Sequence, residues 1–323
     1  MNKPVTIGVI LLSALAMTAC STTAPASNPG PGDTTAPTSI TKVTVGVIPI
    51  LATAPIWLGA AKGFFTDEGI DLDIQSGGGG AAVVPGVVAG DYDFAFGNFV
   101  SVMLAREKGL DLTFVANGNS ADGTPAAGAV IVPTDSPIKS PKDLVGKTVA
   151  VNNLQNINDV TIRTVVDEDG GDSSKIKFVE IAAPDNEAAL ANRQVDAARI
   201  PSPFDIVAVA NGNRILFYNY PAFDSKLSIA GYFTKGDMVK NKPDVVKAFQ
   251  KAMNKSIEYA QSHPDEVREI VTTYTKLKAE VLDKAVLPVW LVEFNRPSLE
   301  KLGSALVEYG VLKKTPDLDA LLP

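Results

Sequence analysis

The amino-acid sequence predicts an α/β protein built from two units. Three observations lead to this prediction. Short strands alternate with short helices from Thr41 onward, the alternation restarts after Pro133, and the chain becomes mainly helical from Asn241 onward. Alternation of this kind is typical of sheets whose strands are joined by crossover helices. A chain of 323 residues is long enough to form two such units.

The first unit begins at KVTVGVIPI, where β-branched residues alternate along the chain. Helices are expected at 54–65, 81–89 and 99–108. Strands are expected at 43–48, 70–75, 92–96, 112–116 and 129–132. A strand over Ile229 to Phe233 is expected to bring the chain back to this unit. The first lobe is therefore assigned to 41–132 together with 231–323.

The second lobe is assigned to 133–230. Ser140 and Pro141 predict a capped helical turn at its start, because serine favours the N-cap and proline the first helical position. Strands are expected at 146–151, 176–181 and 196–200, and helices at 159–167, with Asn158 as its N-cap, and at 186–192. In the C-terminal part, prolines are expected to open helices: Pro243, Pro264, Pro288 and Pro297.

The first forty residues predict export rather than a folded segment. Residues 1–19 have a basic start and a short apolar stretch, which is typical of a signal peptide. Met17-Thr18-Ala19-Cys20 is similar to a bacterial lipobox, so we expect Cys20 to be lipidated, with an ordinary signal peptide as the alternative. Residues 20–40 are expected to form a flexible linker. The protein is then anchored by lipid on the outer face of the cell membrane, with no membrane-spanning segment predicted after residue 20.

Charge and residue counts exclude several classes of function. The net charge of −7 argues against nucleic-acid binding, which needs a basic face. One cysteine, Cys20, and one histidine, His263, exclude a disulfide framework and a zinc site of Cys/His type. They also leave no plausible Ser/His or Cys/His nucleophile. We therefore expect no catalytic residue, no metal and no cofactor.

Four stretches, in this order, are specific when taken together. They are AAKGFF with EGIDL (60–65 and 68–72), AGDYDFA (89–95), IKSPKDLVGKTVA (138–150) and QVDAA (194–198). In these stretches the chain resembles the nitrate/sulfonate/taurine-type solute-binding proteins of ABC transporters, a family that also includes binders of thiamine-pyrimidine precursors. The resemblance implies a type II periplasmic-binding-protein fold, with two α/β lobes, two crossing strands and a ligand cleft.

The resemblance also implies a function without covalent chemistry. A monomeric substrate-binding protein of this family closes on a small molecule and delivers it to a membrane permease, which a cytoplasmic ATPase drives. Two alternatives stay open. One is a lipoprotein that senses the ligand for a membrane receptor. The other is an enzyme similar to the thiamine-pyrimidine synthases, which need a cysteine-rich motif and a histidine. This chain fits poorly because its one cysteine, Cys20, is expected to carry lipid.

Ligands of such sheets bind where strands end and helices begin, because helix N-termini favour anionic groups. Arg199 at the end of a strand is expected to clamp a carboxylate or sulfonate. Phe99 and Phe204 suggest a solute with an apolar body, such as an aromatic one, and nitrate and pyrimidines stay open as alternatives. The candidate ligand-binding residues are Leu51, Thr53, Ala54, Ser76, Gly77, Gly78, Asn98, Phe99, Asn119, Asn153, Asn156, Arg199, Ser202, Phe204 and Tyr232.

Overall fold

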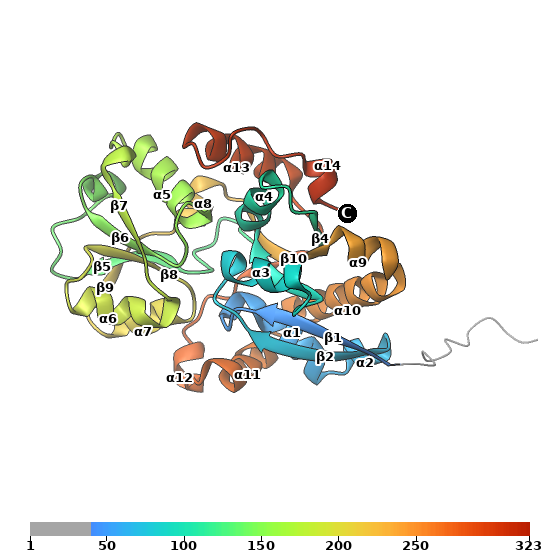
Figure 1. Cartoon of the computed structure of the whole chain (residues 1–323). Coiled ribbons are helices and arrows are strands. Elements are labelled where there is room, and N and C mark those ends of the chain that lie inside the picture. The colour runs from blue at the N-terminus through green and yellow to red at the C-terminus, as the bar shows by residue number, and fades with distance from the viewer. Residues whose placement is uncertain (1–39) are drawn as a thin grey trace, which may run out of the picture. The chain divides into compact units, whose positions relative to one another are not determined.

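Six strands form the first sheet of the computed structural model, which describes residues 40–323. The predicted signal peptide, Cys20 and nearly all of the linker lie outside these residues. The strand order is β11-β4-β10-β3-β1-β2 (Figure 1). The strands are β1 (Thr41–Val47), β2 (Ile70–Ser76), β3 (Phe94–Asn98), β4 (Leu112–Ser120), β10 (Ser228–Lys235) and β11 (Val289–Trp290). β1 runs parallel to β2 and β3, and β10 lies antiparallel between β3 and β4.

Five strands form the second sheet, in the order β7-β6-β8-β5-β9. They are β5 (Ala129–Pro133), β6 (Thr148–Val151), β7 (Lys177–Glu180), β8 (Ala197–Ile200) and β9 (Asn213–Phe217). The chain passes from the first sheet to the second after β4 and returns before β10. The two connections are therefore residues 121–128 and residues 218–227, and both lie next to the edges where the parallel strands end.

The strand at 129–132 differs from its predicted place. It was assigned to the first lobe, but β5 pairs antiparallel with β8 and β9 of the second sheet. The return strand also begins earlier than predicted, because β10 starts at Ser228. Strand propensity is a local property, whereas sheet membership depends on pairing between residues far apart in the sequence. The strand β9 was not predicted.

Helices cover both sheets. Those of the second sheet are α5 (Ile157–Glu168) and α8 (Asn219–Phe223) on one face and α6 (Asn186–Ala191) and α7 (Phe204–Ala210) on the other (Figure 1). The other helices are α1 (Ala54–Ala61), α2 (Phe64–Asp67), α3 (Gly80–Ala89), α4 (Phe99–Glu107), α9 (Gly236–Asn241), α10 (Pro243–Ser262), α11 (Pro264–Thr275), α12 (Ala279–Leu282), α13 (Arg296–Glu308) and α14 (Leu318–Leu321). Pro288 precedes β11 and opens no helix, unlike the other prolines predicted to do so.

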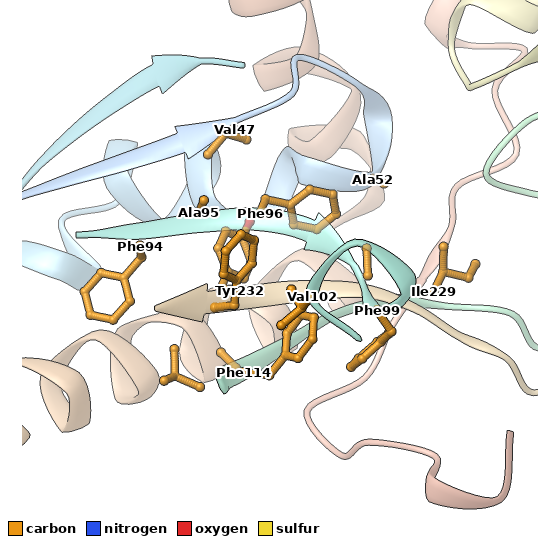
Figure 2. Packing of buried hydrophobic residues seen from close by; sticks show 14 of the residues in the cluster. Val47, Ala52, Phe94, Ala95, Phe96, Phe99, Val102, Phe114, Ile229 and Tyr232 are labelled. Carbon is orange, nitrogen blue, oxygen red and sulfur yellow. The ribbon is translucent and has the colours of Figure 1, made fainter. Parts of the chain in front are cut away.

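Aromatic side chains pack in the core on both faces of the first sheet. The ring of Phe94 stacks on Phe249 of α10, with centroids 4.0 Å apart. The rings of Phe99 and Phe114 lie 4.2 Å apart, and Tyr232 packs on Phe96 (Figure 2). Buried aromatic pairs of this kind add to the hydrophobic contribution of their area. Across residues 40–323, no helix combines the length and the apolar character that a membrane crossing requires.

Candidate functional site

A cavity of about 60 Å³ lies where the carboxyl ends of strands from both sheets meet. One wall comes from the segments that follow β1 and β2, the ends of β3 and β4 and the start of β10. The other comes from the segment that follows β6, the end of β8 with the residues after it, and the two connections between the sheets. The first wall contains Ile48, Ile50, Ala52, Gly79, Gly80, Phe96, Gly97, Asn98, Asn119, Ile229 and Ala230. The second contains Ala127, Asn152, Ile157, Asn158, Arg199, Pro201 and Tyr220. This is the position at which open α/β sheets bind ligands.

Arg199 places a buried positive charge in the second wall. The side chain comes from β8 and is only 4% exposed. Its Nε donates to Asn219 Oδ1 at 3.3 Å, its Nη2 donates to the Ala127 carbonyl at 2.7 Å, and its guanidinium lies 4.4 Å from the Tyr220 ring centre. Among residues 40–323, no carboxylate forms a salt bridge with Arg199. A buried charge without an ion partner is unfavourable and favours binding of an anion.

Asp205 is the acid whose pKa the charge of Arg199 affects, and its carboxylate is hydrogen-bonded to other groups. The Asp205 carboxylate accepts hydrogen bonds from the Ser202 hydroxyl at 2.8 Å and from the Ile206 amide at 2.9 Å. Burial raises the pKa of Asp205, and the hydrogen bond from Ser202, the Ile206 amide and the charge of Arg199 oppose this rise only in part. Burial therefore disfavours the charged form of Asp205 relative to a carboxyl group in water.

Among the helices that begin beside the cavity, α4 and α5 have a side-chain cap, whereas α3 has none. Asn98 caps α4 by accepting from the Ser101 amide at 3.0 Å, and Asn156 caps α5 by accepting from the Ile157 amide at 2.8 Å. The helix α3 begins with Gly79 and Gly80, and Gly79 makes no such bond. The first amides of a helix have no intrahelical acceptor. The N-terminus of α3 therefore offers donors and a positive dipole end to the cavity.

The asparagines around the cavity differ in how well they are satisfied. Asn158 donates to Asn152 Oδ1 at 2.7 Å and accepts from the Tyr220 hydroxyl at 2.8 Å, so these three groups form a paired network. Asn119 is 2% exposed, and its Oδ1 has no hydrogen-bond partner in the described part of the chain. The paired network shapes the second wall, whereas the Asn119 oxygen is buried without a partner in the described part of the chain.

The two walls also contact each other directly. The Leu51 amide donates to the Ser202 carbonyl at 3.0 Å, and Asn156 Nδ2 donates to the Ser101 hydroxyl at 3.1 Å. A Cβ atom at Gly79 would lie 3.0 Å from Asn152 Nδ2. The segments of the two sheets are therefore closely apposed around the cavity.

Of the fifteen predicted site residues, Asn98, Asn119 and Arg199 line the cavity. Asn153 and Asn156 lie directly behind it. The Asn153 carboxamide lies close to Gly79 and accepts from Asn152, and Asn156 rather than Asn158 caps α5.

Five predicted residues lie in the core instead, namely Leu51, Thr53, Ala54, Phe99 and Tyr232. After β1, Ile50 and Ala52 line the cavity, whereas the neighbouring side chains point away from it. The Thr53 hydroxyl is used internally, because it donates to the Ile48 and Ile50 carbonyls. Phe99 packs on Phe114 and Tyr232 packs on Phe96 (Figure 2), so neither ring reaches a solute. The position of a loop can be predicted from the sequence, whereas the direction of each side chain within that loop depends on the folded backbone.

The remaining five predicted residues lie outside the cavity wall. Ser76 and Gly78 are exposed and Gly77 is half-buried, whereas the next two glycines of the same run line the cavity. The Ser202 hydroxyl donates to Asp205 and lines a separate groove beside α7. Phe204 is the first residue of α7 and packs against the core of the second sheet.

Sequence reasoning missed several residues of the wall. Phe96 and Gly97 end β3 and could have been found as the residues before the predicted loop. Tyr220 lies in the second connection between the sheets, and no motif in the sequence marks it. It enters the cavity only because α8 packs on α5 and because Arg199 lies over its ring.

Comparisons with known proteins agree with this geometry. The NMT1/THI5-like family matches residues 51–267. The formylaminopyrimidine-binding protein of Halalkalibacterium halodurans is 24% identical over 226 residues, which are 68% of this chain. The chain spans 65% of the length of that relative, somewhat less than two thirds.

Two solved structures share the fold. The alkanesulfonate-binding protein SsuA from Xanthomonas axonopodis pv. citri, bound to MOPS, superimposes with a TM-score of 0.73 at 15% identity, covering 89% of this chain and 100% of that chain. The periplasmic nitrate-binding protein NrtA from Synechocystis PCC 6803 has a TM-score of 0.73 at 15% identity, covering 88% and 86%. These results confirm the predicted fold class and the family resemblance. The chain has the periplasmic binding protein fold and belongs to the NMT1/THI5-like family.

Proposed function

We propose that this protein is the extracytoplasmic solute-binding lipoprotein of an ABC importer and that it captures a small anionic organic solute. The observation that carries the proposal is Arg199, a buried guanidinium in the cavity wall that forms no salt bridge within residues 40–323. The open N-terminus of α3 reaches the same cavity and favours the same sign of ligand charge. An anion held there receives charge-assisted hydrogen bonds.

The transport role is supported by the relatives. The family match covers most of the folded chain, and proteins named for binding a formylaminopyrimidine, an alkanesulfonate and nitrate share its sequence pattern or its fold. A protein that works in this way binds and releases its solute unchanged. The permease and the ATPase are then its partners.

The size of the cavity favours a compact solute. A cavity of 150 Å³ holds benzene, whereas this one measures about 60 Å³. Phe99 and Phe204, which suggested an aromatic body, lie outside the wall, and the apolar part of the wall consists of isoleucines such as Ile48 and Ile50 together with Phe96 and Tyr220. A short sulfonate, a short carboxylate or nitrate therefore fits best in this arrangement. A larger aromatic acid or a pyrimidine needs the two walls to move apart.

A thermal-shift screen tests the proposal on the secreted chain carrying Cys20→Ser, which keeps it soluble. The panel contains short alkanesulfonates, short carboxylates, nitrate and neutral aminopyrimidines. Ligands that bind only the native state stabilise it by about 2.7 kcal/mol at a hundredfold excess over Kd. We expect the anions to raise the melting temperature by several degrees. A rise with the neutral aminopyrimidines alone would refute the anionic ligand.

The anchor and the import role need separate measurements. Cys20→Ser is expected to move the protein from the membrane fraction to the soluble fraction of the host, since one cysteine carries the lipid. Uptake of the radiolabelled hit is expected to fail in a strain that lacks this gene. Normal uptake together with a lost transcriptional response would instead favour the sensing role. Chemical conversion of the hit by the purified protein would favour an enzyme.

A further inference from the structure

The guanidinium of Arg199 is held by three groups, and all three come from the two connections between the sheets. Asn219 Oδ1 accepts from Nε, the Ala127 carbonyl accepts from Nη2, and the Tyr220 ring lies against the face of the guanidinium. Within residues 40–323 no hydrogen bond uses Nη1, and Nη1 is not one of the fully buried atoms that lack a partner. Nη1 therefore remains available to a solute in the cavity that Arg199 lines.

Asn219 belongs to α8 and does not itself line the cavity. Its side chain is completely buried, and both ends of its carboxamide are used. Nδ2 donates to the Thr161 hydroxyl at 2.8 Å, and that hydroxyl donates in turn to the Ile157 carbonyl at 2.7 Å. Because the hydroxyl proton is already directed to Ile157, the hydroxyl can only accept from Asn219. The oxygen of the carboxamide must therefore face Arg199.

This series of hydrogen bonds connects Arg199 on β8 to the first turn of α5, which begins beside the cavity. A free arginine side chain has many rotamers, and ordering it costs entropy. Since Nε and Nη2 are already bonded, this cost is met when the chain folds and not when a solute binds. An anion entering the cavity therefore meets a guanidinium that is already oriented.

We propose that Asn219 is a positioning residue of the solute site, which fixes the guanidinium of Arg199 so that Nη1 is left for the bound anion. The proposal rests on the proposed function, because it assumes that the anion binds at Arg199. It also specifies how the anion is held. Asn219 and Ala127 already use Nε and Nη2, so the solute is bound at the Nη1 end and is not clamped across Nε and Nη2.

The orientation of Arg199 can be measured without any solute. The test uses the secreted chain carrying Cys20→Ser with isotope-labelled arginine, and NMR follows the exchange of the Arg199 Nε–H with solvent. The signal is assigned by its loss in Arg199→Met. We expect Asn219→Leu to speed up this exchange by about tenfold or more, because Nε loses its acceptor. Asn186→Leu is the matched control, since Asn186 is equally buried but lies on α6, on the other face of the second sheet, and it should leave the exchange unchanged.

Calorimetry with methanesulfonate and with acetate measures the effect on binding. Asn219→Leu is expected to weaken both anions by about 2- to 12-fold, which corresponds to the loss of one hydrogen bond. In the Arg199→Met background the same change should have no further effect, because Asn219 acts only through the guanidinium. An equal loss in both backgrounds would mean that Asn219 supports the fold and does not position Arg199.

Two further variants keep the test decisive if Asn219→Leu does not fold. Asn219→Asp retains the acceptor for Nε and adds a charge that compensates Arg199, so the exchange should stay slow while both anions bind about tenfold more weakly or worse. Thr161→Val removes only the hydroxyl behind Asn219 and should speed up the exchange less than Asn219→Leu does.

Unchanged Nε–H exchange in whichever of Asn219→Leu and Thr161→Val folds would overturn the proposal. Binding of neither anion by the unmutated site would instead contradict the proposed function, and the exchange measurement would still decide whether Asn219 holds Arg199.

Discussion

The two walls of the cavity offer a solute different kinds of contact. The wall of the six-stranded sheet presents backbone at Gly79, Gly80 and Gly97 and the neutral amides of Asn98 and Asn119. The wall of the five-stranded sheet presents the charge of Arg199, and its asparagines are already hydrogen-bonded to each other or to Tyr220. For the proposed anion, the second wall supplies a full positive charge, whereas the first wall supplies the partial charge of the α3 N-terminus and neutral hydrogen-bonding groups.

The largest expected effect concerns the charge of the second wall. We expect Arg199→Met to weaken binding of the anionic hit by about 10- to 150-fold, because a hydrogen bond to a charged group contributes about 1.5–3 kcal/mol. Kd is measured by calorimetry. Arg163→Met is the control, since Arg163 donates to the Ser173 carbonyl and lies over Phe178, away from the wall. An unchanged Kd in Arg199→Met would remove the distinction between the walls.

A smaller effect is expected from the backbone of the first wall. A Cβ atom at Gly80 would lie 2.7 Å from the Ser101 hydroxyl and 3.1 Å from the Asn98 amide. Gly80→Ala should therefore destabilise the protein by about 1–3 kcal/mol through overpacking and weaken binding. Gly78→Ala is the matched control, because its Cβ meets only Ala82 Cβ at 3.3 Å. Urea unfolding and Kd are measured for both, and equal behaviour would argue against a tightly packed wall.

The smallest effect concerns Asp205, the acid on which the charge of Arg199 acts. Burial raises its pKa in the folded state, so its neutral form stabilises the fold below the ordinary carboxyl pKa of about 4, and this contribution is lost as the pH rises through the folded-state pKa. Relative to the wild-type protein, Asp205→Asn should therefore gain stability as the pH rises from 4 to 7. Melting temperatures measured over this range test the sign. The opposite slope would mean that Asp205 is stabilised as an anion and compensates Arg199.

Much of the fold followed from local sequence pattern. The strand expected at 70–75 lies at 70–76, and the helix expected at 99–108 lies at 99–107. In α10, the apolar residues Val246, Phe249, Met253 and Ile257 are all buried, as their helical spacing predicts. These elements can be predicted because burial of one face of a helix or strand makes apolar residues recur at a fixed spacing in the sequence.

The positions of loops also followed from the sequence, because parallel strands end at one edge of their sheet. The residues that face the cavity did not. Leu51 and Thr53 were predicted, whereas Ile50 and Ala52 line the wall, a difference of one position that turns the side chain to another side of the segment. The assignment of β5 to the second sheet likewise depended on pairing with β8 and β9, which lie about seventy to eighty residues along the chain.

The sequence alone determined the class of fold, the family, the loops that surround the cavity and the choice of Arg199 as a candidate. Only the tertiary structure decided that this guanidinium is buried without an ion partner, that Tyr220 lies beneath it, and that the Asn119 oxygen has no donor within residues 40–323. The physical reason is that strand and helix patterns are encoded by neighbours in the chain. Charge compensation and hydrogen-bond satisfaction are instead properties of groups that only folding brings together.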